Sequence, residues 1–196
     1  MDDLRPNEVI ALCNKPHPAK IRHPMPAPLP ANETARLQAL QSYQLLDTAA
    51  EQGFDDVVQV ASFICGASTA LMTLVDDRRQ WFKAKVGVKT SETLRDEGFC
   101  AYTILGNELF IVEDALASQR SADHPLVVAD PHIRFYAGAP LITPEGLGLG
   151  ALCVIDREPR QLTPEQSRAL EALARLVVTE VELRRVSATS PKRRLT

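Results

Sequence analysis

Apolar and polar side chains alternate most clearly in the middle of the chain. In residues 133–139 every second side chain is apolar, which is typical of a strand with two different faces. Residues 151–155 form a continuous apolar run, as expected for a strand covered on both sides. The intervening TPEG at residues 143–146 has turn chemistry. We therefore predict a central pair of neighbouring strands joined by a tight loop.

Apolar residues recur at helical spacing in four other stretches. Residues 33–46 and 54–64 predict two amphipathic helices, and residues 99–105 predict a short one that ends at Gly106. A long helix is expected over residues 164–186, because Thr163 followed by Pro164 is a typical helix start.

Three further segments have strand character. Residues 69–75 are apolar and β-rich, and residues 109–112 predict a short strand. In residues 80–86 Trp81 and the lysines alternate with Phe82 and small apolar residues, which predicts the half-exposed second strand of a hairpin. The order of elements indicates an α+β fold with an antiparallel sheet. We expect the first, second and last helices on one face, and loops with the short helix on the other.

Composition and charge narrow the class of protein. The chain has 196 residues with a formal net charge of −3, which suggests one domain with tails and disfavours a nucleic-acid partner. No apolar run approaches the roughly 20 residues of a membrane span, and the N-terminus lacks the apolar core of a signal peptide. We expect a cytoplasmic protein without a membrane partner.

The ends of the chain differ from its middle. Residues 1–31 hold seven of the fourteen prolines and predict an extended tail. Residues 187–196 predict a basic C-terminal tail. The folded domain is therefore expected over residues 32–186.

Several segments together resemble the GAF domain family, in the bacterial sensory subgroup often fused to histidine kinases or diguanylate cyclases. The matching motifs include ETARLQALQSYQLLDT at residues 33–48, ETLRDEGFCAYTIL at 92–105 and DPHIRFYAGAPL at 130–141, in family order. The resemblance implies a five- to six-stranded antiparallel sheet with helices on one face. It also implies a pocket for a small molecule or cofactor, unidentified here, beneath loops on the other face.

The chain departs from the subgroup pattern in two places. The short helix usually reads Ser-Phe-Cys-Ala-His, whereas this chain has Gly98 at the first position and Tyr102 at the last. Tyr102 removes an imidazole that could switch a proton or bind a ligand. The loop that usually reads Asp-Pro-Arg-Phe-Ala-Asp is SQRSAD at residues 118–123.

Several chemical roles are possible for Cys100. It lies near the start of a short helix, whose dipole favours a thiolate. GAF relatives that attach bilins use a Cys followed by His, but Ala101 follows here. Relatives that reduce free methionine sulfoxide use partner cysteines, and none lies between the hairpin and Cys100. These departures count against both activities without excluding them, and a redox-sensing thiol and a plain pocket-lining or core Cys are the other interpretations.

Polar and aromatic residues complete the expected ligand site. If Arg134 and Tyr136 share a face with Tyr102 and Asp114, they supply the few oriented polar groups that a pocket needs. Alternatively, Arg134 pairs with an aspartate, Asp114 or Asp130, and fastens a loop. The expected ligand-binding set is Trp81, Phe99, Cys100, Tyr102, Asp114, Arg134 and Tyr136.

No catalytic triad, paired catalytic carboxylates or phosphate-binding Gly loop has meaningful spacing, so we expect no enzymatic activity. The leading hypothesis is a stand-alone sensory module that binds a small molecule. Because only ten residues follow Val186, its output should pass through a kinase or cyclase partner or through dimerisation. The alternatives are a Cys100-centred redox sensor or methionine sulfoxide reductase-like enzyme, and a ligand-free dimerisation scaffold.

The long C-terminal helix predicts a homodimer. Leu170, Leu173, Val177 and Val181 form one apolar stripe, while Leu176 and Leu183 lie a heptad apart beside it. A second exposed stripe is most simply covered by another copy of the chain. The alternative is that both stripes pack within one chain.

Overall fold

A computed structural model describes residues 27–119 and 121–189 of the chain. The expected tails therefore lie mostly outside the described residues. Within them two helices are followed by a hairpin, a short strand, two short helical segments, another short strand, a further short helix, a strand pair and a long final helix.

One six-stranded antiparallel sheet forms the centre, in the order β3-β2-β1-β6-β5-β4. The strands are β1 (Thr69–Val75), β2 (Arg79–Val86), β3 (Glu92–Leu94), β4 (Phe110–Val112), β5 (Phe135–Ile142) and β6 (Gly148–Asp156). The predicted central pair is β5 and β6, which align Ala137 with Val154. Because β1 pairs with β6, the hairpin joins the central pair into one sheet. The predicted α+β class and antiparallel sheet are confirmed.

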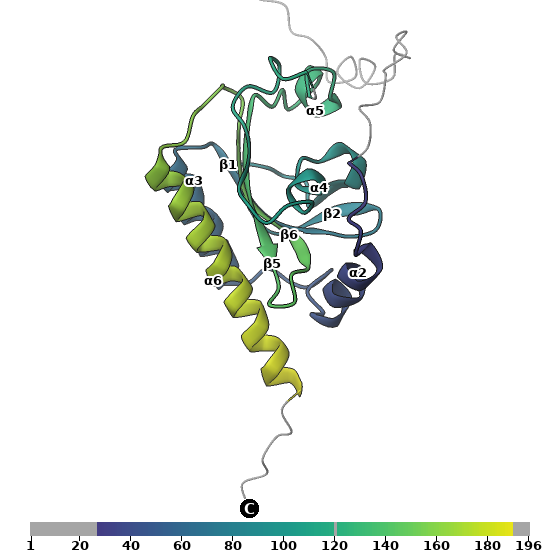
Figure 1. Cartoon of the computed structure of the whole chain (residues 1–196). Coiled ribbons are helices and arrows are strands. Elements are labelled where there is room, and N and C mark those ends of the chain that lie inside the picture. Colours follow the sequence, from purple (N-terminus) through teal and green to yellow (C-terminus); the bar gives the residue numbers. More distant parts are fainter. Residues whose placement is uncertain (1–26, 120, 190–196) are drawn as a thin grey trace, which may run out of the picture.

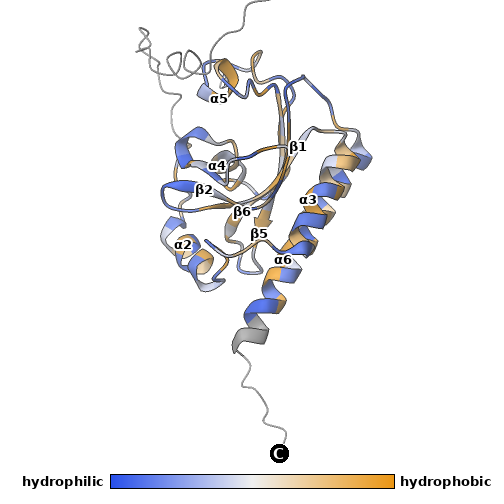
Figure 2. Ribbon diagram, turned by 180° about the vertical axis from the view of Figure 1, so that it is seen from behind, coloured by the Kyte–Doolittle hydropathy of each residue, from blue (hydrophilic) through white to orange (hydrophobic). Residues whose placement is uncertain are grey.

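Helices cover one face of this sheet. Helices α3 (Gln52–Cys65) and α6 (Pro164–Thr189) lie side by side along it, whereas α2 (Glu33–Ser42) lies nearer one end of the strands (Figures 1 and 2). Leu40 of α2 still packs in the same core cluster as Phe54 of α3 and Leu170 of α6. Helix α3 ends where Gly66 adopts a left-handed φ of 62°.

The opposite face lies beneath small elements. These are the 3-10 helix η2 (Arg95–Glu97), α4 (Cys100–Thr103) and α5 (Pro125–Val128). A second core cluster, which includes Leu71, Phe99 and Tyr136, fills this side. The sheet thus separates two apolar layers, one beneath helices and one beneath loops, as expected.

The pattern of β2 was predicted incorrectly. The β1–β2 register shifts between Met72 and Thr73, so the alternation of side chains along β2 is interrupted near Lys83. Lys83 is not half-exposed but only 3 % exposed, and its ammonium lies over the rings of Phe54 and Trp81. A bulge of this kind cannot be seen in a period-2 pattern.

Two helix boundaries also differ from expectation. Helix α2 ends at Ser42, four residues before the predicted end, because the chain turns through Gln44 at a φ of 52°. Helix α6 continues to Thr189, beyond the predicted end at Val186.

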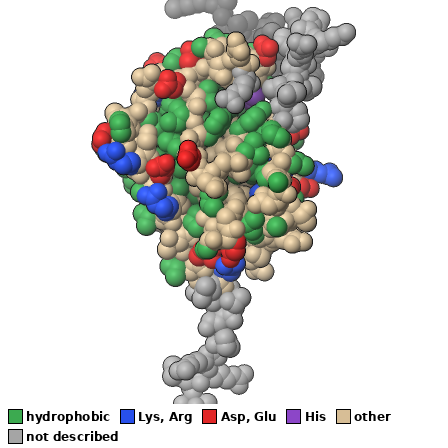
Figure 3. Space-filling view, in the orientation of Figure 1, with side chains coloured by type: hydrophobic (Ala, Val, Ile, Leu, Met, Phe, Trp, Pro, Cys, Tyr) green, Lys and Arg blue, Asp and Glu red, His purple; other side chains and the backbone are tan. Residues whose placement is uncertain are grey.

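Apolar side chains reach the surface of α6. Leu170 and Val177 are buried, whereas Leu176 and Leu183 are each 60 % exposed. In the view of Figure 3, hydrophobic side chains are interspersed with a few acidic and basic ones. The second predicted stripe is therefore not buried within the chain.

Candidate functional site

The loop-covered face of the sheet encloses a cavity of about 460 Å³. Its floor comes from β1, β2 and β6, and its cover from the segment before α4 and from α5. Apolar lining residues include Leu71, Phe82 and Ile133. Such a mostly apolar cavity with a few polar groups is typical of small-molecule sites.

Two thiols meet a phenol at one wall of this cavity. Cys100 Sγ lies 3.7 Å from Cys153 Sγ, and the Tyr136 hydroxyl donates to Cys100 Sγ at 3.3 Å. The same hydroxyl lies 2.6 Å from Thr103 Oγ1. All of these side chains are buried. The cluster joins α4 to β5 and β6 and leaves Cys100, but not Cys153, lining the cavity.

The thiols of the cluster differ in acidity. The hydrogen bond with Cys153 lowers the pKa of Cys100, although burial opposes this. The same hydrogen bond, together with burial, raises the pKa of Cys153 well above its ordinary value. Cys100 is therefore the thiol that ionises first. By contrast, burial raises the pKa of Cys65 to about 11.

Phe99 separates this cavity from a smaller one of about 270 Å³, because it lines both. Its ring stacks on Tyr136 at 5.2 Å and on His124 at 4.9 Å between centroids. Tyr102 and Asp114 line the smaller cavity. The two spaces thus share one aromatic wall.

Gln80 is a polar group built into the larger cavity. It is 1 % exposed, and its Nε2 donates to the carbonyls of Leu94 and Arg95. Gly98 allows this arrangement, since a Cβ there would lie 1.4 Å from Gln80 Nε2. The glycine that departs from the subgroup pattern is therefore matched to a buried glutamine.

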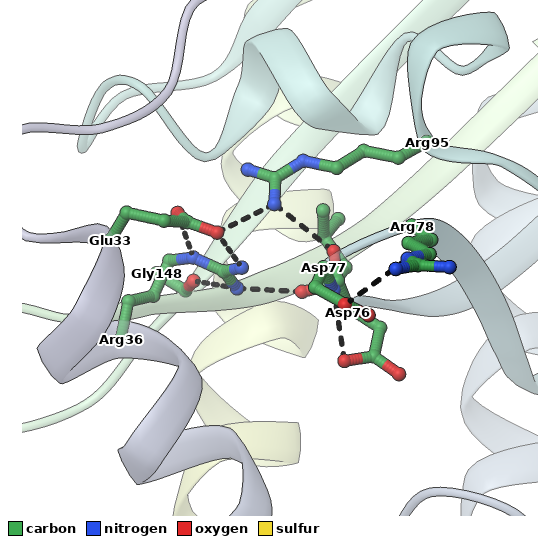
Figure 4. A network of polar contacts seen from close by, with 8 residues as sticks. Glu33, Arg36, Asp76, Asp77, Arg78, Arg95 and Gly148 are labelled. Carbon is green, nitrogen blue, oxygen red and sulfur yellow. Dashed lines mark hydrogen bonds and ion pairs between the residues drawn. The ribbon is translucent and has the colours of Figure 1, made fainter.

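Arginines and one carboxylate link the cavity wall to the first helix (Figure 4). Glu33 accepts hydrogen bonds from Arg36 at 2.8 Å and from Arg95 at 2.5 Å. Arg36 also donates to the carbonyls of Val75 and Gly148. Burial opposes ionisation of Glu33, but the arginine hydrogen bonds outweigh it and lower its pKa to about 2. The network fixes α2 to β1, β6 and the segment before α4.

The expected ligand-binding residues do not form one set. Phe99, Cys100 and Tyr136 line the larger cavity, while Tyr102, Asp114 and again Phe99 line the smaller one.

Trp81 and Arg134 line neither cavity. Trp81 lies on the opposite face, in the helix-side core. Arg134 donates to the carbonyls of Val127 and Ile133, so it fastens a loop through the backbone rather than through Asp114 or Asp130.

Two residues of the site were missed from the sequence. Cys153 is a buried core residue, as its apolar sequence context predicts, but its contact with Cys100 was not predicted. Gln80 and His124 occupy buried positions that polar residues rarely take. A cue for Gln80 was present, because Gly98 replaces the usual serine.

No group of three or more His, Cys, Asp or Glu side chains that could hold a metal ion occurs in the described part of the chain. Among the helices of residues 27–119 and 121–189, none is long and apolar enough to cross a membrane.

The chain is similar to proteins of several kinds. It is 44 % identical over 155 residues to the cyclic di-GMP phosphodiesterase PA2567 of Pseudomonas aeruginosa. The aligned region covers 79 % of this chain and 26 % of that protein. The chain thus spans about a quarter of that relative.

Solved structures share the fold at low identity. The GAF domain of an Acinetobacter phosphoenolpyruvate-protein phosphotransferase is 15 % identical with a TM-score of 0.59, covering 84 % of this chain and 99 % of that one. The free methionine-R-sulfoxide reductase of Neisseria meningitidis is 16 % identical with a TM-score of 0.57, covering 82 % and 97 %. The GAF domain model matches residues 49–181, more than half of the chain. The chain therefore belongs to the GAF domain family.

Proposed function

We propose that this domain is a sensory module that binds a small molecule in the larger cavity and passes the signal to another protein or domain. The observation that carries the proposal is the cavity of about 460 Å³ on the loop-covered face of the sheet. Its volume suits a small organic ligand.

The lining favours a neutral, mostly apolar ligand with a few hydrogen-bonding groups. Apolar side chains such as Leu71 and Phe82 dominate. The carboxylate of Asp156 is already engaged by Arg160 at 2.7 Å and by the Ser68 amide at 3.2 Å. Burial would raise its pKa, but the backbone amides of Arg157 and Ser68 and then Arg160 outweigh this and lower it. A fixed, neutralised carboxylate offers acceptor atoms rather than a free charge.

A chain of contacts connects this cavity to the first helix. Gln80 lines the cavity and donates a hydrogen bond to the carbonyl of Arg95, whose guanidinium binds Glu33 of α2. A ligand that displaces Gln80 would disturb its hydrogen bond with the Arg95 carbonyl and, through Arg95, the contact with Glu33. Since the contacts are discrete hydrogen bonds, a small displacement can break one of them.

We propose that the signal of ligand binding is transmitted through α6 to a partner protein or domain. Leu176 and Leu183 are exposed along this helix, and a homodimer would cover them. The Pseudomonas relative is named a cyclic di-GMP phosphodiesterase. By analogy, we propose that a cyclic di-GMP-processing enzyme is the output, alongside the kinase or cyclase expected from the sequence.

Native mass spectrometry of the purified protein tests the ligand proposal. We expect a bound small molecule, and we expect Val88→Trp to remove it, because Val88 lines the cavity. Val128→Trp is the matched control, since Val128 is 51 % exposed and lies outside the cavity lining. A mass without adduct in the unmodified chain, together with unchanged thermal stability in Val88→Trp, would favour the ligand-free dimerisation scaffold instead.

A second candidate function is thiol redox sensing at Cys100. The observation that favours it is the 3.7 Å separation of Cys100 and Cys153. A peroxide would oxidise the Cys100 thiolate to a sulfenic acid and be reduced to an alcohol or water. The Cys153 thiol would then attack that sulfur, forming a disulfide and releasing water.

Intact mass after hydrogen peroxide treatment separates this candidate from ligand sensing. We expect the mass to fall by about 2 Da as two thiols become a disulfide, and the loss to be absent in Cys100→Ser and Cys153→Ser. Cys65→Ser is the control, because the pKa of Cys65 is raised and Cys65 lines neither cavity. Addition of oxygen at Cys100 without loss of the two hydrogens would exclude the disulfide.

A further inference from the structure

Gln80 carries a hydrogen-bond acceptor that the fold leaves unused. The side chain is 1 % exposed, and its Nε2 donates to the carbonyls of Leu94 at 3.3 Å and Arg95 at 3.2 Å. Its Oε1 accepts no hydrogen bond from any residue that the structure describes. Buried polar groups almost always have partners, so an unpaired acceptor requires an explanation.

The orientation of this amide is fixed by its neighbours. Carbonyl oxygens only accept hydrogen bonds, so a flipped amide would place Oε1 against the carbonyls of Leu94 and Arg95. Gly98 also packs closely on the amide, because a Cβ at that position would lie 1.4 Å from Nε2 and 2.3 Å from Oε1. The unpaired oxygen therefore cannot exchange places with the nitrogen.

This oxygen is accessible from the larger cavity. Within residues 27–119 and 121–189, His124 Nε2 is the one completely buried side-chain nitrogen or oxygen without a partner, so the unpaired Gln80 Oε1 keeps some accessible surface. Gln80 lines the larger cavity and not the smaller one. An oxygen that a water-sized sphere can touch can also be approached by a donor atom at about 2.9 Å. A donor on a ligand in the larger cavity can therefore reach Oε1.

The rest of the lining favours a neutral ring over a charged ligand. The carboxylate of Asp156 is already paired with Arg160, so an ammonium group would lose its water without gaining an unpaired carboxylate. Phe82 and Phe99 supply aromatic surface to the same cavity. A flat ring packs well against such side chains.

We propose that Gln80 selects the ligand of the larger cavity, and that this ligand is a neutral planar ring bearing an N–H donor. The donor hydrogen-bonds Gln80 Oε1, and the ring packs among the apolar side chains. The inference rests on the proposed function, because it assigns a chemical class to the ligand of the same cavity. A ring with an acceptor in place of the N–H group would leave Oε1 unpaired and facing a second acceptor, which weakens binding.

Indole is the probe, because it joins a planar apolar ring system to a single N–H donor. Benzofuran is the comparison, since an ether oxygen replaces the N–H group while the shape is retained. Isothermal titration calorimetry of the unmodified chain should show saturable binding of both rings, with indole bound about tenfold more tightly. In ¹⁵N correlation spectra, the side-chain amide of Gln80 should shift more with indole than with benzofuran.

Two variants make the test specific. Gln80→Met keeps a side chain of similar length and removes Oε1, so the affinity for indole should fall about tenfold relative to that for benzofuran. The affinity for benzofuran should be retained, because that ring forms no hydrogen bond with Gln80. Gln59→Met is the matched control, since Gln59 is exposed and lines neither cavity. It should leave the preference for indole unchanged.

Equal affinities for indole and benzofuran in the unmodified chain would overturn the role of Gln80 and leave the cavity as a binding site. A preference for indole that survives in folded Gln80→Met would do the same. If Gln80→Met does not fold, the affinity ratio and the amide shift of the unmodified chain decide. Absence of saturable binding of either ring would refute this inference, and native mass spectrometry would then decide the proposed function separately.

Discussion

Replacement of Glu33 by Gln tests whether the buried arginine network stabilises the domain. Glu33 is 15 % exposed at its side chain, and its two oxygens accept hydrogen bonds from Arg36 and Arg95. Glutamine would keep one acceptor but would turn an amide N–H group toward a guanidinium. The change therefore removes a charge and also leaves buried donors without an acceptor.

The magnitude follows from the pKa of Glu33. A fall from the ordinary value of 4.5 to about 2 in the folded chain corresponds to a contribution of about 3 kcal/mol at pH 7. Because the folded pKa is the lower one, this contribution is fully present above pH 4.5 and is lost as the pH falls toward 2. At pH 3 it should have shrunk to about 1.4 kcal/mol.

Urea unfolding at a series of pH values between 7 and 3 measures this effect. We expect the difference in unfolding free energy between Glu33→Gln and the unmodified chain to be about 3 kcal/mol at neutral pH and to narrow below pH 4.5. Glu165→Gln is the control, because Glu165 and its partner Arg168 are both largely exposed, and its unfolding midpoint should not change. If the two stability curves of Glu33→Gln and the unmodified chain run parallel across this pH range, the carboxylate is not stabilised by the arginines.

Three further changes test other parts of the fold. Lys83→Met should cost about 2 kcal/mol of unfolding free energy, because it removes the ion pair between the fully buried ammonium and Glu51, whose side chain is 34 % exposed. Urea titration measures this cost, and an unchanged midpoint contradicts it. Gly98→Ala should cost about 2 kcal/mol, because its Cβ would displace the buried Gln80 amide; thermal unfolding reports it, and a stability equal to that of the unmodified chain would show that Gln80 moves freely. Leu176→Glu combined with Leu183→Glu should convert a dimer to a monomer in sedimentation, with folding retained, since both side chains are 60 % exposed; a monomeric unmodified chain would refute the dimer.

Hydrophobic periodicity was sufficient to predict most of the fold. The strands β1 and β6 and the helices α3 and α6 carry patterns that match their burial. Strand β5 was located from its alternating pattern, but it is buried on both faces. Where the pattern failed, a local irregularity had shifted it. The bulge in β2 places Lys83 in the core, where the ammonium binds Thr48 Oγ1 and the carbonyl of Ala49. A buried lysine of this kind looks like a surface residue in the sequence.

The composition of the site was harder to predict, because its partners come from distant elements. Cys100 and Cys153 are separated by 53 positions and meet only because α4 packs on β6. No spacing rule for cysteines detects such a pair. Arg134 was expected to pair with Asp114 or Asp130, but its guanidinium donates hydrogen bonds to two backbone carbonyls instead. The partner that a side chain contacts depends on which groups the folded chain brings within reach.

The smaller cavity shows how one departure from a family pattern acquires meaning in three dimensions. The subgroup that the chain resembles usually has a histidine where this chain has Tyr102, and that position lines the same cavity as His124. An imidazole therefore still lines the cavity, although it comes from the residue that caps α5 instead of from α4. At this position its Nδ1 accepts a hydrogen bond from the Leu126 amide, so in the neutral ring the proton resides on Nε2. A histidine free to use either nitrogen could donate or accept, whereas this one can only donate. The change of position thus leaves an imidazole that is held within the fold by the Leu126 amide and by stacking on Phe99.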